Sequence, residues 1–114
     1  MKSIIYLTLF IGCAVFASCA ISPRDMTAAV KSARTPADHQ ALARAYQDES
    51  KEMEMKADLH KKLLAQYIAA SGLNSREAHN LIDHCDWLIR IYQQAAERNA
   101  SMAASHHRLA AQTN

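Results

Sequence analysis

Residues at seven-residue intervals form two columns along the chain. One column holds His39, Tyr46, Met53, His60 and Tyr67, and the other holds Ala78, Cys85, Tyr92, Asn99 and His106. A heptad step returns to the same side of an α-helix, so each column lies on one helix face. Companion columns are predicted to complete a buried face that two charged residues interrupt: Leu42, Glu49, Lys56 and Leu63, and Leu81, Leu88, Ala95, Met102 and Leu109.

The first long helix is predicted to begin at Pro36. Thr35 is a residue type that caps helix N-termini, proline is favoured at the first helical position, and Asp38 adds an acidic side chain at the third. Gly72 can supply the left-handed conformation that ends a helix. The first long helix therefore spans about residues 36–71.

A second long helix is predicted from about Ser75 to beyond Leu109, because Asn74 and Glu77 have the spacing of a capping box. Each long helix has about 36 residues and a length of roughly 54 Å. The short connection makes the two helices antiparallel neighbours. Ser22-Pro23 repeats the start signal of the first long helix, so a short helix is expected before it. The predicted fold class is all-α: an antiparallel helical hairpin of two long helices with a short N-terminal helix.

The predicted hairpin has more apolar surface than two helices can enclose. On the second helix this surface comprises Trp87, Leu88, Ile89, Ile91 and Tyr92, and on the first helix Leu59, Leu63, Leu64, Tyr67 and Ile68. Either the short N-terminal helix covers it, or two hairpins combine into a four-helix bundle. The breadth of the apolar surface favours the second arrangement, which predicts a homodimer.

The first residues have the three parts of a secretory signal. A lysine precedes an apolar run from Ile4 to Ala17, and small residues follow. The apolar run is shorter than a typical membrane-spanning helix. The segment Phe16–Cys19 resembles the lipobox of bacterial lipoproteins, where a small residue precedes a cysteine that becomes the lipidated N-terminus. The resemblance is confined to this segment. It implies that residues 1–18 are a signal peptide and that Cys19 carries lipid, including palmitate.

The same resemblance implies a location and a division of the chain. Ala20 after the lipidated cysteine favours the outer membrane, with the protein facing the periplasm. Residues 19–35 then form an anchor linker that contains the short helix, and residues 36–114 form the hairpin. Three alternatives remain open: a second lipobox-like run that ends at Cys13, cleavage after Ala20 that releases a soluble product, and an uncleaved leader that acts as an anchor.

Charge and cysteine content argue against two features, namely nucleic-acid binding and an intramolecular disulfide. The chain has thirteen Lys and Arg residues and eleven Asp and Glu residues, and loss of Lys2 with the leader leaves twelve basic residues. No excess of charge remains for binding nucleic acid. With Cys13 removed and Cys19 lipidated, Cys85 is the one free thiol, so no intramolecular disulfide is expected. A lone thiol in an oxidising compartment has to be buried, bound or paired with another chain.

The two heptad columns also carry side chains that bind metals. With the turn centred at residues 72–73, His60 is level with Cys85, and His39 is level with His106. Neighbouring histidines can lean toward each pair, which predicts two candidate sites: His60, His84 and Cys85 near the turn, and His39, His106 and His107 at the open end. Imidazole with thiolate suits zinc or copper(I), and three histidines suit zinc or copper(II). The competing interpretation is ordinary packing, since histidine, tyrosine and cysteine are all common on helix interfaces.

The two long helices resemble each other. A shift of 46 positions places Leu42, Tyr46, His60 and Leu63 on Leu88, Tyr92, His106 and Leu109. Under this shift Cys85 occupies the position of His39.

The sequence contains none of the common catalytic motifs. It contains no glycine-rich phosphate loop, nucleophile elbow or Glu-x-x-His pair of the di-iron type. The sequence therefore predicts a non-catalytic envelope lipoprotein whose hairpin serves self-association or partner binding, with copper or zinc binding through the His/Cys columns as an additional candidate role. A periplasmic metal buffer or delivery protein is the alternative function. A Cys/His-dependent enzyme is a remote one, because no third orienting group for Cys85 and His60 can be named.

Overall fold

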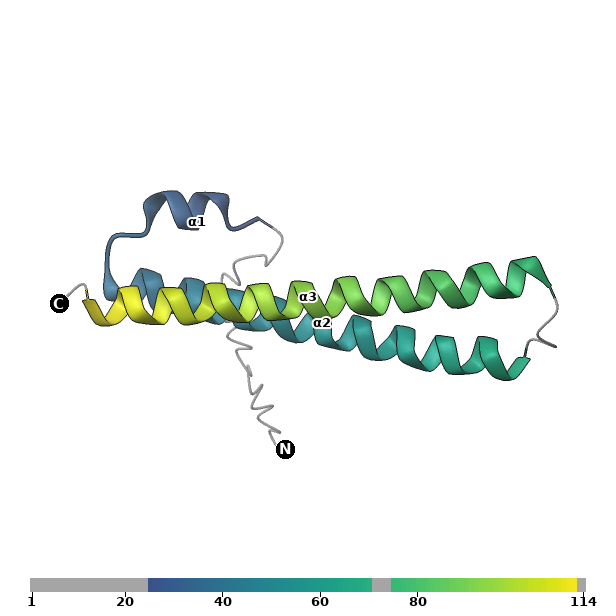
Figure 1. Ribbon diagram of the computed structural model, residues 1–114. Coiled ribbons are helices and arrows are strands. Elements are labelled where there is room, and N and C mark those ends of the chain that lie inside the picture. Colours follow the sequence, from purple (N-terminus) through teal and green to yellow (C-terminus); the bar gives the residue numbers. More distant parts are fainter. Residues whose placement is uncertain (1–24, 71–74, 113–114) are drawn as a thin grey trace, which may run out of the picture.

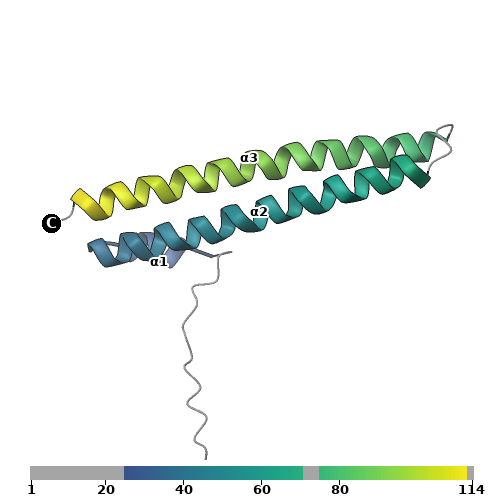
Figure 2. The same ribbon diagram turned by 90° about the horizontal axis from the view of Figure 1, so that it is seen from below.

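The computed structural model describes residues 25–70 and 75–112, which form three α-helices. They are α1 (Thr27–Ser32), α2 (Pro36–Ala70) and α3 (Arg76–Gln112). Figures 1 and 2 show α2 and α3 side by side and antiparallel, with α1 lying against the first half of α2. The predicted all-α hairpin with a short N-terminal helix is confirmed. The predicted signal peptide and the lipidation site Cys19 lie outside the described residues.

The start of α2 is fixed by reciprocal capping. The backbone N–H of Asp38 donates to Thr35 Oγ1 at 3.2 Å, while Asp38 Oδ2 accepts hydrogen bonds from the backbone N–H groups of Arg34 and Thr35 at 3.0 and 2.9 Å. Pro36, which lacks an N–H, occupies the first helical position. The predicted start of the first long helix is confirmed, with an aspartate in the place usually taken by glutamate.

The start of α3 differs by one residue from the predicted capping box. Ser75 provides the cap, because its Oγ accepts a hydrogen bond from the backbone N–H of Ala78 at 3.1 Å. Its carbonyl accepts the N–H of His79 at 3.3 Å, which is the first bond of the helix. Asn74, the predicted cap, lies outside the described residues. Serine and asparagine cap helices about equally well, so adjacent candidates leave the starting residue open in the sequence.

A column of small side chains joins α2 to α3. The buried positions recur every seven residues on each helix: Ala43, Ser50 and Ala57 on α2, and Ile89, Ala96, Ala103 and Ala110 on α3. At the centre, the hydroxyl of Ser50 donates to the carbonyl oxygen of Ala96 at 2.8 Å. Small side chains allow two helix backbones to approach closely. The resulting core is thin, and Leu42 is the one large side chain in the described residues that is fully buried.

The prediction that the companion columns are buried is therefore confirmed for Leu42 and wrong for their other members. Leu81 and Met102 are each 44% exposed, and Glu49, Lys56 and Leu63 are only half-buried. The helices are rotated so that the alanines on the other side of the His/Tyr columns meet instead. Small residues at the contact leave room for the large His and Tyr side chains beside them. The leucines of α2 and α3 other than Leu42 stay partly exposed.

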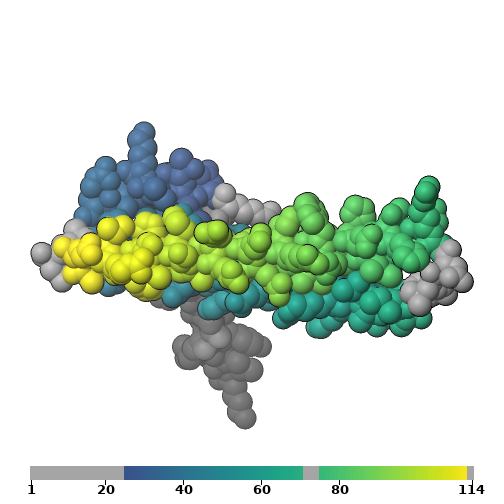
Figure 3. All heavy atoms as spheres, viewed as in Figure 1, coloured from purple at the N-terminus to yellow at the C-terminus, as the bar shows by residue number. Residues whose placement is uncertain are grey.

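Helix α1 covers part of that leucine side. Ala33, just after α1, and Leu42 of α2 are both buried. Met26, Val30 and Tyr46 line a shallow hollow between the two helices. Figure 3 shows α1 over the open half of the hairpin, whereas the half near the turn is uncovered on that side. In the described part of the chain, none of the helices has a stretch long and apolar enough to cross a membrane.

Candidate functional site

At the open end of the hairpin, three rings from the two helices form a cluster of His39, Tyr46 and His106, called here the open-end cluster. The Nδ1 atoms of His39 and His106 are 3.1 Å apart, a hydrogen-bond distance. The ring of His106 also stacks on Tyr46, with centroids 5.5 Å apart and ring planes within 11°. The two histidine rings stack at 5.4 Å and 27°. The structure therefore brings together two of the predicted open-end ligands and adds a tyrosine to them.

The protonation of this pair is constrained. One Nδ1 must donate and the other accept, so at least one of the two imidazoles is neutral. Partial burial lowers the pKa of His106 below its usual 6.5, and the nearby charge of His39 lowers it further. A neutral imidazole is the form that binds a metal ion.

A second ring pair near the turn, called here the turn cluster, is formed by His60 and Tyr92. His60 stacks on Tyr92 with centroids 5.5 Å apart and ring planes within 20°. The ammonium group of Lys56 lies 5.9 Å from the centroid of the Tyr92 ring. The Nδ1 atom of His60 is buried and has no hydrogen-bond partner. Cys85 is 5% exposed and its thiol is free.

The internal repeat relates the two clusters to each other. The shift of 46 positions maps His39, Tyr46 and His60 of α2 onto Cys85, Tyr92 and His106 of α3. In both clusters a tyrosine stacks on a histidine of the other helix at 5.5 Å. Ser50 and Ala96, which are joined by the central hydrogen bond, are also 46 positions apart. The hairpin therefore has an internal pseudo-two-fold axis that passes between these two residues.

The other predicted ligands lie elsewhere. His107 is exposed, and its Nε2 lies 3.2 Å from Nε2 of Gln47. Both residues are on the side of the α2–α3 contact that lies opposite to the leucine columns. His84 is exposed, whereas its neighbour Cys85 is buried. Within residues 25–70 and 75–112, no group of three or more His, Cys, Asp or Glu side chains is arranged to hold a metal ion. The described chain brings two imidazole donors together at the open-end cluster.

The ring pairs were not anticipated, although the columns contain both tyrosines. Level pairing predicts Tyr92 against Met53 and Tyr46 against Asn99, whereas each tyrosine stacks on a histidine one heptad further along the partner helix. Helical side chains lean toward the N-terminus of their own helix. In an antiparallel pair, the side chains of the two helices lean in opposite directions along the hairpin axis. Two long side chains therefore make contact even though their Cα atoms are at different levels along the hairpin. This lean, applied to the sequence columns, would have identified the ring pairs.

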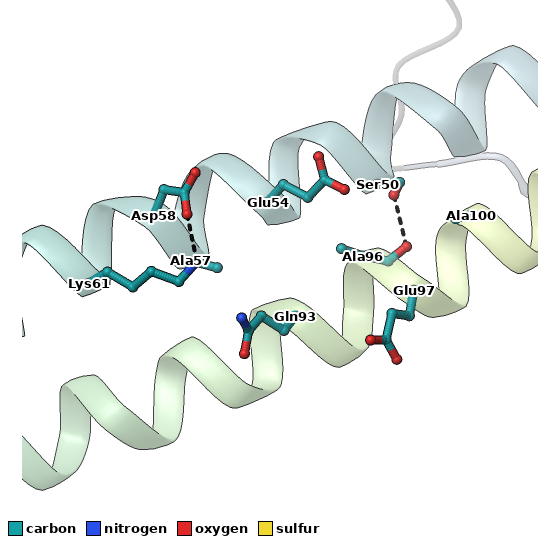
Figure 4. Close-up of a pocket in the computed structure, with 9 residues that line it drawn as sticks. All are labelled: Ser50, Glu54, Ala57, Asp58, Lys61, Gln93, Ala96, Glu97 and Ala100. Atoms are coloured by element: carbon teal, nitrogen blue, oxygen red, sulfur yellow. Dashed lines mark hydrogen bonds and ion pairs between the residues drawn. The ribbon is translucent and has the colours of Figure 1, made fainter.

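One side of the hairpin carries a polar groove. Residues of both helices line it: Ser50, Glu54, Ala57, Asp58, Lys61, Gln93, Ala96, Glu97 and Ala100. Lys61 forms an ion pair with Asp58 at 2.8 Å. In Figure 4 the carboxylates of Glu54 and Glu97 point away from each other. The groove therefore lacks a convergent set of ligands.

The opposite side carries several aliphatic side chains. Gln47 and His107 lie on one side of the α2–α3 contact. In an antiparallel helix pair, the equivalent heptad positions of the two helices on the other side of the contact also lie next to each other. Near the turn these positions hold five aliphatic residues, called here the aliphatic face, namely Leu59, Leu63, Leu81, Leu88 and Ile91, and they also hold the polar residues Lys56, Gln66 and His84. Leu59 is 54% exposed and Leu81 44% exposed. This face continues beyond the part that α1 covers.

Comparison with known proteins gives no family assignment. No family model matches the chain, and searches of curated proteins and of solved structures found no significant match.

Proposed function

We propose that this protein is a non-catalytic, exported and lipid-anchored hairpin that self-associates through its aliphatic face into a four-helix bundle. The observation that carries the proposal is the distribution of side-chain size. The buried seam is built mainly from alanines, whereas Leu59 and Leu81 remain about half exposed on one flank. A second copy is the occupant that the proposal assigns to this face.

The size of the face suits a small dimer interface. Two helices of about 10 Å diameter are about 20 Å wide, and residues 54–70 of α2 extend for about 24 Å. The face then covers about 480 Å² per chain and close to 1,000 Å² in a symmetric dimer, near the lower limit for a specific interface. Because α1 already covers the open half, it does not compete for this area.

The energy of association is modest. Complete burial of a leucine or isoleucine contributes about 1.5–3 kcal/mol, so burial of the remaining half contributes about 1 kcal/mol per residue. Five such residues on each chain give about 10 kcal/mol per dimer, comparable with the cost of association of about 4–15 kcal/mol. We therefore expect a dimer that dissociates on dilution.

Paired substitutions test this proposal. In sedimentation equilibrium, the mature protein is expected to be a dimer at high concentration. The double variant Leu59→Glu with Leu81→Glu should be a helical monomer, because four glutamates would be buried in the dimer. Met55→Glu is the matched control, because Met55 is 65% exposed on the outer side of α2. A folded wild-type monomer at high concentration would rule out the bundle.

Lipid attachment at Cys19 is the second part of the proposal. Its support is the lipobox-like segment Phe16–Cys19 in the sequence. The intact mass of membrane-extracted protein should include an acyl increment, and Cys19→Ser should remove it. An unmodified protein that begins after Ala20 would instead indicate ordinary cleavage and a soluble product.

Metal binding at the open-end cluster is a second candidate function, which would make the protein a metal buffer or delivery protein. Two zinc–nitrogen bonds of about 2.0–2.1 Å at a tetrahedral angle place the nitrogens about 3.3 Å apart. The 3.1 Å between the Nδ1 atoms of His39 and His106 is close to this value. Zinc titration should therefore raise the melting temperature of the wild type and not of His39→Ala. Equal responses would exclude this cluster as the site.

A further inference from the structure

Tyr46 connects the open-end cluster to the short N-terminal helix. Its ring stacks on His106 of α3, with centroids 5.5 Å apart and ring planes within 11°. The same side chain lines the hollow between α1 and α2, together with Met26, which is the N-cap of α1, and Val30. One tyrosine therefore takes part in the contact between α2 and α3 and also in the surface on which α1 lies.

Helix α1 depends on that surface. It has six residues, none of them buried, and Val30 is 47% exposed. A helix this short is not stable in water by itself, so α1 needs its contact with α2. Tyr46 is the residue of α2 that lines the hollow under α1. A movement of the Tyr46 ring therefore acts directly on the support of α1.

The hydrogen bond between His39 and His106 requires one Nδ1 atom without a proton. The two Nδ1 atoms are 3.1 Å apart, so one donates its proton to the lone pair of the other. When both imidazoles are protonated, two N–H groups and two positive charges face each other. Partial burial and the charge of His39 lower the pKa of His106 below 6.5, so the pair takes up its second proton only below that pH.

The charged groups around the pair come from all three helices. Asp38 lies next to His39 and interacts with its charge, but the same carboxylate caps the start of α2 by accepting two backbone N–H groups. On α1, Asp25 accepts a backbone N–H group of its own helix, and Lys31 lines the hollow and adds a positive charge. On α3, His107 follows in the chain and is exposed. Asp38 thus stabilises charge on His39, whereas burial and the His39 charge oppose protonation of His106.

We infer that the His39–His106 pair is a pH-sensitive switch for α1: when both imidazoles are protonated the pair separates, the Tyr46 ring leaves its stack and α1 detaches from α2. The turn cluster stacks one histidine on a tyrosine, so the same change of pH creates no pair of like charges there. The hydrogen bond from Ser50 to the Ala96 carbonyl contains no titrating group, so α2 and α3 remain paired at the centre. Detachment uncovers the part of the leucine side that α1 covers at neutral pH. This inference is independent of self-association, lipid attachment and metal binding.

The test is a set of nuclear Overhauser spectra of the purified protein, with a metal chelator present, at about pH 7.5 and about pH 5, on either side of the ordinary histidine pKa. At the higher pH we expect cross-peaks between the Val30 methyl groups and the Tyr46 ring. At the lower pH these cross-peaks should be lost, while cross-peaks between Ser50 and Ala96 remain. The midpoint of the loss should lie below pH 6.5.

Two histidine variants separate the switch from other effects of protonation. His39→Gln leaves the His106 ring on Tyr46 and gives it an uncharged amide partner, so two like charges cannot form and α1 should stay attached at the lower pH. His107→Gln removes the exposed neighbouring histidine and should lose the Val30–Tyr46 cross-peaks as the wild type does. Circular dichroism of each variant checks that the helices are retained.

Three results would overturn the inference. The first is a wild type that keeps the Val30–Tyr46 cross-peaks at the lower pH or lacks them at the higher pH. The second is an equal loss in His39→Gln, which would assign the pH effect to other groups. The third is a simultaneous loss of the Ser50–Ala96 cross-peaks, which would indicate that the whole hairpin unfolds.

Discussion

Replacement of Ala103 by leucine tests the close contact between the small residues of α2 and α3 beside the open-end cluster. Ala103 is 2% exposed and belongs to the buried column of α3. A leucine at this position has to push α2 and α3 apart or distort their side chains. His106, one turn further along α3, would then move away from His39 and Tyr46.

The magnitude can be assembled from these contacts. Overpacking of a buried position costs about 1–3 kcal/mol. Loss of the His39–His106 hydrogen bond and of the Tyr46–His106 stack each costs about 0.5–1.5 kcal/mol. The free energy of unfolding should therefore fall by about 2 kcal/mol or more. For a domain of this size, that corresponds to a decrease in melting temperature of at least about 8 °C.

Circular dichroism at 222 nm, at one fixed protein concentration, measures this decrease. Ala104→Leu is the matched control, because Ala104 is exposed and the change in helix propensity is the same. The control should melt close to the wild type. Equal melting temperatures for Ala103→Leu and Ala104→Leu would refute the close alanine contact between the helices.

Two further predictions concern pH. The pKa of His106 is lowered mainly by burial, so the unfolded chain takes up its proton first as pH falls. The free energy of unfolding should therefore keep its full value above about pH 6.5 and decrease below it. In melting experiments His106→Gln should make this decrease smaller, and an unaltered pH profile would contradict the prediction. Hydrogen bonds from the backbone N–H groups of Arg34 and Thr35 lower the pKa of Asp38 to about 2. Its stabilising effect should therefore be present above pH 3.8 and disappear as pH falls through about 2, and an ordinary midpoint in an NMR titration of the carboxyl would contradict the cap.

Local signals predicted the helices well because each depends on a few neighbouring residues. Thr35, Pro36 and Asp38 specify the start of α2 through their own hydrogen bonds and backbone geometry. Ser75 and Asn74 are equally suitable caps, so the sequence does not distinguish which of them begins α3, and the structure shows that it is Ser75. The level pairing of His39 with His106 also followed from the turn position and is confirmed by their contact.

The face that each helix buries was harder to predict. Hydrophobicity favours the leucine columns, because leucine gains more from burial than alanine. In the hairpin, however, the small residues Ala43, Ser50 and Ala57 meet the alanines of α3, and the leucines other than Leu42 remain partly exposed at the side. The seven-residue spacing of these small residues was present in the sequence. The strength of the leucine pattern reflects a surface that two helices do not enclose.

The proposed self-association is tested most directly by the concentration dependence of thermal unfolding. Melting of the purified mature protein should be followed over a 100-fold range of concentration. For a dimer that unfolds to monomers, this range corresponds to about 2.7 kcal/mol, so the melting temperature should rise by several degrees. Leu59→Glu with Leu81→Glu should show no such rise. A melting temperature of the wild type that is the same at every concentration would contradict self-association through the aliphatic face.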